Sequence, residues 1–312
     1  MYIKKQGVAM KIFAVENGMK GFCSLGSIVL AVMLVLFSTE SVRSDSSTIS
    51  LTFGTYESDK AAVVQQQFTP ILEYIQHQMK KKLGRSVDIK LKIYNTYEEG
   101  NNAIVKGEVD FARFGPASYI IAKDKNPKIN LIAMEHKDGK KRFNGVIVVP
   151  AQSPVKSLAD LNGRRFAFGD NTSTIGRYLS QAELAKAGVR ANDLKSFDYL
   201  DRHDMVFKAV ETGVYDAGAL KESTFKKLNK DGQLRVVHTF DNVTKPWIAK
   251  SGMEQKVFEA LKEALLNLKD PSVLKDLKEA TGFLLATDDD YAFVRKGMQL
   301  SKDFEGRGLA KR

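Results

Sequence analysis

From residue 49 onward, the hydrophobic pattern changes repeatedly between the period of a strand and the period of a helix. Short apolar or alternating runs predict β-strands at 49–55, 87–94, 109–114, 129–135 and 145–150. Apolar residues at helical spacing predict helices over 60–83, 97–106 and 117–123. Pro70 is the one unfavourable residue in the first of these helices. Strands that alternate with helices in this way indicate an α/β fold.

A second stretch of the chain shows the same alternation. Strands are expected at 165–168, 197–200 and 216–220, and helices at 157–161, 174–187 and 203–212. A strand over 234–240 is expected to lead the chain out of this second stretch, and helical patterns follow over 254–268, 273–280 and 289–303. This order predicts two α/β lobes, residues 45–145 and 146–240. Residues 241–312 are expected to cross over and return to the first lobe as C-terminal helices.

Residues 1–44 have the pattern of an export signal. An uncharged run over 22–37 follows the basic residues Lys4, Lys5, Lys11 and Lys20. The run is shorter than a typical membrane span, so the pattern allows either a cleaved signal peptide or an N-terminal anchor. Cys23 precedes the run, whereas the cysteine of a lipoprotein would follow it. It is also the only cysteine, which excludes a disulfide within the chain and a cysteine nucleophile in the exported part.

The formal net charge of +11 changes the picture little, because the basic residues are dispersed. Residues 1–44 contain five Lys or Arg and two Glu, which leaves +8 for the remainder. No arginine-rich or aromatic-interleaved stripe suggests a nucleic-acid surface, so nucleic acid is not expected as a partner. A modest positive field would favour the approach of a small anion.

The segment 169–178 is typical of an anion site, since it has the pattern of a strand end, a hydroxyl-rich turn and a helix start. The first N–H groups of a helix have no intrahelical partner and lie at the positive end of its dipole. Ser173 and Thr174 would add hydroxyl donors beside them. The alternative is an ordinary N-cap, which such residues often form.

Several short motifs occur in an order that resembles the phosphonate/phosphite family of periplasmic solute-binding proteins. They include Phe53-Gly54-Thr55-Tyr56, Phe114-Gly115-Pro116-Ala117-Ser118-Tyr119, Ser173-Thr174-Ile175-Gly176, His203-Asp204 and Tyr215-Asp216-Ala217-Gly218-Ala219. The resemblance covers about residues 49–285. It implies a type II-like periplasmic binding protein fold with hinge-linked, Rossmann-like α/β lobes. It also implies a component of an ABC importer that closes over a small phosphorus oxyanion: phosphonate, phosphite or phosphate.

The resemblance assigns four ligand contacts to the second lobe. Ser173 and Thr174 match the serine-threonine pair that donates hydrogen bonds to the oxyanion. His203 matches a histidine that donates a ring N–H, unless it only packs on its own helix turn. Asp216 matches an aspartate that accepts from a P–OH or binds an ammonium group on the ligand. The alternative for Asp216 is a simple turn residue at a strand end.

From the first lobe, the resemblance assigns Tyr56, Ser118 and Tyr119. Tyr56 would supply an O–H donor and an aromatic wall, and Ser118 and Tyr119 would present another helix start to the cleft. Tyr119 could instead belong to the core. Arg113 stands where the family is usually apolar, which leaves it as either a bidentate anion ligand or a surface arginine that snorkels. Hydroxyl groups that the family carries at the crossing strand are lost in 143–145.

An enzyme is the alternative class. Ser173 as nucleophile, His203 as base and Asp216 as the orienting carboxylate would satisfy a triad by residue type alone. The histidines lack metal-ligand spacing, and no nucleophile elbow or phosphate loop is present in the sequence. We therefore expect a monomeric periplasmic binding protein without cofactor, metal or catalytic activity. Its partner would be an ABC permease or, alternatively, a membrane sensor kinase or chemoreceptor.

Overall fold

A computed structural model describes residues 47–57, 60–277 and 280–306, and the export signal expected in 1–44 lies outside these ranges. The described residues, from 47 to 306, belong to one compact unit. Within the described ranges the structure contains no helix with both the length and the apolar character that a membrane span requires.

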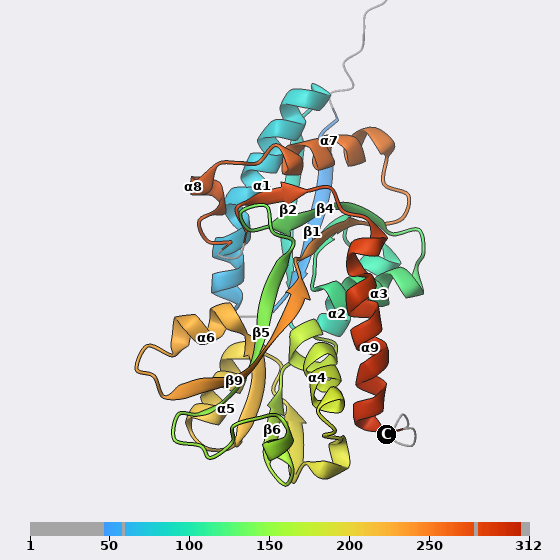
Figure 1. The fold of residues 1–312 in the computed structure, drawn as a ribbon. Helices are drawn as coiled ribbons and strands as arrows, with labels where there is room; N and C mark the ends of the chain where they lie inside the picture. The colour runs from blue at the N-terminus through green and yellow to red at the C-terminus, as the bar shows by residue number, and fades with distance from the viewer. Residues whose placement is uncertain (1–46, 58–59, 278–279, 307–312) are drawn as a thin grey trace, which may run out of the picture. The chain divides into compact units, whose positions relative to one another are not determined.

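The first sheet has six strands in the order β11-β4-β10-β3-β1-β2. Strands β1, β2 and β3 are parallel to one another, while β10 and β11 pair antiparallel with their neighbours. The strands are β1 (Ile49–Tyr56), β2 (Val87–Tyr94), β3 (Phe111–Arg113), β4 (Asn130–His136), β10 (Pro246–Ala249) and β11 (Gly282–Leu284). The helices packed around them are α1 (Ala61–Leu83), α2 (Tyr97–Lys106), α3 (Pro116–Lys125), α7 (Gln255–Leu266) and α8 (Pro271–Leu274) (Figure 1).

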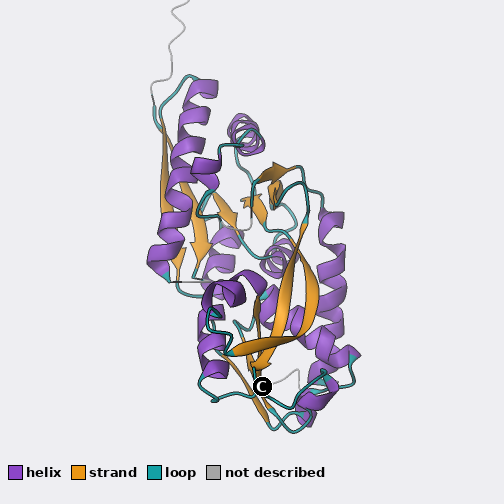
Figure 2. Cartoon of the chain, turned by 60° about the vertical axis from the view of Figure 1, so that its left-hand side comes forward, coloured by secondary structure: helices purple, strands orange, loops and turns teal. Residues whose placement is uncertain are grey.

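The second sheet has five strands in the order β7-β6-β8-β5-β9. They are β5 (Arg142–Pro150), β6 (Arg165–Phe168), β7 (Ser196–Tyr199), β8 (Ala217–Lys221) and β9 (Leu234–Val243). The helical elements are η1 (Ala159–Leu161), η2 (Thr174–Leu179), α4 (Ser180–Lys186), η3 (Ala191–Asp193), α5 (His203–Glu211) and α6 (Glu222–Leu228). Helices flank the strands of both sheets, which confirms the predicted α/β class (Figure 2).

The chain crosses between the two sheets along a pair of long antiparallel strands. Strand β5 carries it into the second sheet after β4, and β9 carries it back to β10. The two strands pair from Arg142 opposite Val243 to Pro150 opposite Leu234, and they lie side by side in Figure 1. Two adjacent strands thus carry the chain from the first sheet to the second and back.

Proline at position 70 does not break α1, which is continuous over Ala61–Leu83. A proline inside a helix costs about 3 kcal/mol, because it removes a hydrogen bond and clashes with the preceding turn. Burying one large aliphatic or aromatic side chain returns about 1.5–3 kcal/mol. The apolar face of α1 buries six such residues, Val64, Phe68, Ile71, Leu72, Ile75 and Met79. Tertiary packing therefore outweighs the local penalty.

The last helix, α9 (Ala292–Glu305), departs from the expected return to the first lobe. Helix α7 packs against α1 of the first sheet's unit, but α9 packs mainly against α4 and η2 of the second. Phe304 is fully buried there, with its ring centroid 5.5 Å from Phe168 and 5.7 Å from Phe197. Arg177 of η2 also forms an ion pair with Glu305. The reason is burial: the aromatic residue at the end of α9 completes the second core.

Candidate ligand-binding site

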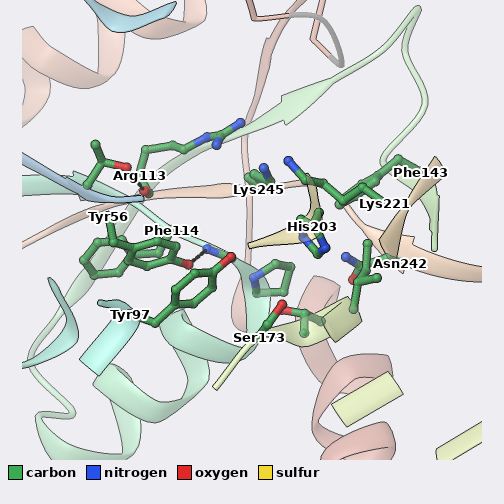
Figure 3. A pocket seen from close by; sticks show the side chains of 15 residues that line it. Tyr56, Tyr97, Arg113, Phe114, Phe143, Ser173, His203, Lys221, Asn242 and Lys245 are labelled. Atoms are coloured by element: carbon green, nitrogen blue, oxygen red, sulfur yellow. Dashed lines mark hydrogen bonds between the residues drawn. The ribbon is translucent and has the colours of Figure 1, made fainter. Parts of the chain in front are cut away.

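A cavity is lined by residues from both sheets and from the helices that follow their strands. The side chains that carry polar groups into it are Tyr56, Tyr97, Ser173, Thr174, His203, Lys221 and Lys245 (Figure 3). Counted as the space open to the centre of a water molecule, its volume is about 30 Å³. One water needs about 10–15 Å³ on this measure, so the cavity suits a solute of only a few heavy atoms.

Two glycines hold the hydroxyl-bearing turn against the end of β6. The backbone N–H of Gly169 donates to the carbonyl of Gly176 at 2.9 Å. A Cβ on Gly176 would lie 2.8 Å from the Cα of Gly169, closer than side chains approach backbone. The turn can therefore press onto the strand end only without side chains at these positions. Ser173 caps η2 by accepting from the Gly176 N–H at 3.0 Å, as the N-cap interpretation expected.

Thr174 links the two halves of the cavity. Its Oγ1 accepts a hydrogen bond from the backbone N–H of Ala117, in the first turn of α3, at 2.9 Å. Both Ser173 and Thr174 are buried and line the cavity. Each hydroxyl oxygen accepts one backbone hydrogen bond. The Ser173 hydroxyl also hydrogen-bonds the phenol of Tyr97, while the hydrogen of Thr174 is able to donate into the cavity.

Two stacked tyrosines form the wall contributed by the first sheet's unit. The rings of Tyr56 and Tyr97 are 3.7 Å apart at 24°. The Tyr56 hydroxyl accepts from the Gly115 N–H at 2.6 Å and shares a 3.0 Å hydrogen bond with Ser118. Burial is the main cause that raises the pKa of Tyr56 and of Tyr97. Both phenols are therefore protonated donors at neutral pH.

Ser118 and Tyr119, expected together in the cleft, point to different places. Ser118 lies behind Tyr56 and reaches the cavity only through that hydroxyl. Tyr119 points away, because its hydroxyl donates to Asp288 at 2.7 Å and its ring packs 5.0 Å from Tyr291. Consecutive residues of a helix are rotated by about 100°, so both could not face one cavity. For Tyr119 the core interpretation fits the structure.

His203 begins α5 and faces the cavity with only 4% of its surface exposed (Figure 3). Its Nδ1 is buried and has no hydrogen-bond partner among the described residues. Burial, followed by the charges of Lys221 and Lys245, holds the pKa of His203 well below its usual range. The imidazole is therefore neutral at pH 7, with one ring nitrogen as donor and the other as acceptor.

Asp216 departs from the expectation that it contacts the ligand. Its carboxylate accepts from the backbone N–H and the guanidinium of Arg165, each at 2.8 Å. It precedes the first residue of β8, whereas Lys221 at the other end of that strand lines the cavity. Five strand residues span roughly 16 Å, so the carboxylate is at the wrong end of β8. The proposed triad therefore lacks its orienting carboxylate.

Arg113 is a buried structural residue, which differs from both roles considered for it. Its guanidinium makes a bidentate ion pair with Glu135 at 2.7 and 3.0 Å, and Trp247 donates to the same carboxylate at 3.1 Å. Arginine and glutamate side chains are 9% and 2% exposed. Glu135 thus compensates the charge that Arg113 brings to the cavity wall.

The cavity residues that were not anticipated as ligand contacts include Tyr97, Lys221, Asn242 and Lys245. Tyr97 was expected only as the first residue of a helix, and the position of an aromatic residue directly after a strand-to-helix turn was an available signal. The lysines gave no signal, because isolated lysines are common on surfaces. In the part of the chain that the structure describes, no cluster of His, Cys, Asp or Glu could hold a metal.

Two α/β units joined by paired strands, with a polar cavity at the helix starts between them, define a periplasmic-type solute-binding protein. Residues 53–291 match the family described as the periplasmic substrate-binding protein of phosphonate ABC transporters, so the chain belongs to that family. The chain is thus the substrate-binding component of an ABC transporter, which supports import over the receptor alternative.

Two characterised relatives cover most of the chain. Over 268 residues it is 26% identical to the probable ABC transporter phosphite binding protein PhnD1 of Prochlorococcus marinus, covering 78% of this chain and 90% of that protein. Over 277 residues it is 24% identical to the phosphate-import protein PhnD of Mycolicibacterium smegmatis, covering 79% and 84%.

Solved structures share the fold. PhnD1 from Prochlorococcus marinus in complex with methylphosphonate matches with a TM-score of 0.72 at 24% identity, covering 81% of this chain and 98% of that one. The periplasmic aliphatic sulphonate binding protein SsuA from Escherichia coli matches with a TM-score of 0.56 at 20% identity, covering 82% and 88%. These matches agree with the two-sheet architecture described above.

Proposed function

We propose that the protein captures a compact phosphorus oxyanion (phosphonate, phosphite or phosphate) in this cavity and delivers it to a membrane permease. The observation that carries the proposal is the buried imidazole of His203, which lines one small cavity together with the hydroxyl-bearing residues Ser173 and Thr174. Relatives named for phosphite and for phosphate, and a structural neighbour holding methylphosphonate, support the same class of ligand.

The proposed contacts are Tyr56, Tyr97, Ser173, Thr174 and His203. Each offers an O–H or N–H group, and hydrogen bonds to a charged oxygen contribute roughly 1.5–3 kcal/mol each. Ser118 acts by positioning Tyr56. Closure over the ligand excludes water, which strengthens these bonds. Tyr119 and Asp216 have no part in this site, because other side chains engage them away from the cavity.

The same proposal includes how the protein works in the cell. An N-terminal leader exports it, or tethers it if uncleaved, and it acts in the periplasm as a monomer. It binds its ligand without chemical turnover, since Asp216, the carboxylate of the triad considered above, is paired with Arg165.

Calorimetry of the purified protein with phosphate, phosphite, methylphosphonate, 2-aminoethylphosphonate and sulfate tests the proposal. We expect stoichiometric binding of at least one phosphorus oxyanion and a loss of roughly 1.5–3 kcal/mol for each hydroxyl removed in Ser173→Ala with Thr174→Ala. Ser301→Ala is a matched control, because Ser301 is equally buried but donates to Met298 in α9. No binding by the wild type, or unchanged affinity in the double variant, contradicts the proposal.

A further inference from the structure

Among the described residues, the charged side chains that line the cavity are all basic: Arg113, His203, Lys221 and Lys245. Glu135 compensates Arg113, and His203 is neutral. Lys221 therefore brings a positive charge to the wall opposite the tyrosines.

Lys221 has a specific position in this wall. It ends β8, and Figure 3 shows its side chain extending toward Lys245. The acidic residue beside it, Glu222, is engaged by Lys226 at 2.7 Å and by the Asn144 amide at 3.3 Å. Within the described ranges, no carboxylate forms an ion pair with Lys221.

We propose that Lys221 makes the cavity a charge filter, which accepts phosphorus oxyanions with an uncharged or anionic substituent and rejects those that carry an ammonium group. The inference rests on the proposed function and narrows its substrate class. Phosphite, phosphate and alkylphosphonates pass this filter, and aminoalkylphosphonates do not.

The cavity is small, so a substituent on a bound phosphorus oxyanion lies close to the lining side chains. With a volume of about 30 Å³, it holds such a substituent near Lys221. Like charges held close together in a partly desolvated site cost several kcal/mol. After burial, the charges of Lys221 and Lys245 also lower the pKa of His203, which lines the same cavity.

Among the residues that the structure describes, no acidic side chain lines the cavity as a partner for an ammonium group. Asp170 is buried beneath the tyrosine side and is not a lining residue. Its Oδ1 accepts from both the N–H and the hydroxyl of Thr172 at 2.6 Å. Asp216, the expected acceptor, is paired with Arg165 at the far end of β8.

Two ligands of matched shape, ethylphosphonate and aminomethylphosphonate, test the filter. They differ mainly in that the first carries a methyl group where the second carries an ammonium group. At pH 7.5 we expect aminomethylphosphonate to bind the wild type roughly tenfold or more weakly than ethylphosphonate. Lys221→Glu should reverse the order. Lys195→Glu, an equal charge change at an exposed residue elsewhere in the same unit, should leave the order unchanged.

Methylphosphonate provides a second test, because it is smaller than ethylphosphonate and aminomethylphosphonate and does not require the cavity to hold either of them. Its affinity should fall in Lys221→Gln and fall further, by roughly tenfold or more, in Lys221→Glu. Equal binding of the matched pair, or unchanged methylphosphonate affinity in Lys221→Glu, overturns the filter while the proposed function stands. Failure of every phosphorus oxyanion to bind the wild type overturns both.

Discussion

The Oγ1 of Thr174, at the start of η2, accepts a hydrogen bond from the backbone N–H of Ala117, at the start of α3, over 2.9 Å. The bond joins a turn of the second sheet's unit to a helix of the first. It places two helix starts around one cavity, with the hydrogen of Thr174 available to the ligand. Opening of the cleft between the units would have to break it.

Replacing Thr174 by valine keeps the shape of the side chain and removes this bond. The Ala117 N–H then loses its partner in the closed state, so Thr174→Val should weaken methylphosphonate binding by about 1–3 kcal/mol. Thr174→Ser keeps the hydroxyl and should retain most of the affinity. Calorimetry on the two variants decides the matter, and equal affinities would show that the bond makes no contribution to binding.

The two stacked tyrosines should respond differently to loss of their hydroxyls. Tyr97→Phe keeps the ring stack and should reduce affinity by roughly 1.5–3 kcal/mol while changing the free energy of unfolding little. Tyr56→Phe also deprives the Gly115 N–H of its acceptor, which should lower the free energy of unfolding by about 1–3 kcal/mol. Urea unfolding and calorimetry on both variants test this split. A stability loss confined to Tyr97→Phe would contradict the assignment.

His203 should make stability depend on pH in a defined direction. Its pKa in the folded protein is well below the value near 6.5 that it has when unfolded. Below about pH 6.5 the unfolded chain takes up a proton that the folded chain does not, so the free energy of unfolding decreases as pH falls. The His203→Gln variant has no imidazole to protonate at this position. Its free energy of unfolding should therefore decrease less than that of the wild type between pH 7.5 and 5.0. Parallel pH profiles from urea unfolding would refute the prediction.

Asp216 provides a negative test of the site. Its ion pair with Arg165 is partly exposed, and such pairs contribute about 0–1 kcal/mol. Asp216→Asn should therefore leave methylphosphonate affinity within about 0.5 kcal/mol of the wild type. A large loss of affinity without a loss of stability would return Asp216 to the binding site, against its position in the fold.

Much of the fold followed from the sequence, because hydrophobic period is a local property. The expected strands at 49–55 and 165–168 correspond to β1 and β6, and the helix over 203–212 corresponds to α5. Strands β10 and β11 were not predicted. They form because neighbouring strands supply their hydrogen bonds.

The chemistry of the hydroxyl-bearing turn could also be predicted from the sequence, because Ser173, Thr174 and their flanking glycines lie within a few residues of one another. Which remote groups join them was not a local matter. The direction of β8 places Lys221 at the cavity and Asp216 away from it, and the rotation of α3 turns Tyr119 toward Asp288. The sequence by itself determined the elements and the hydroxyl-bearing turn. Only tertiary packing decided the charge of the opposite wall, because it brings together side chains that are far apart along the chain.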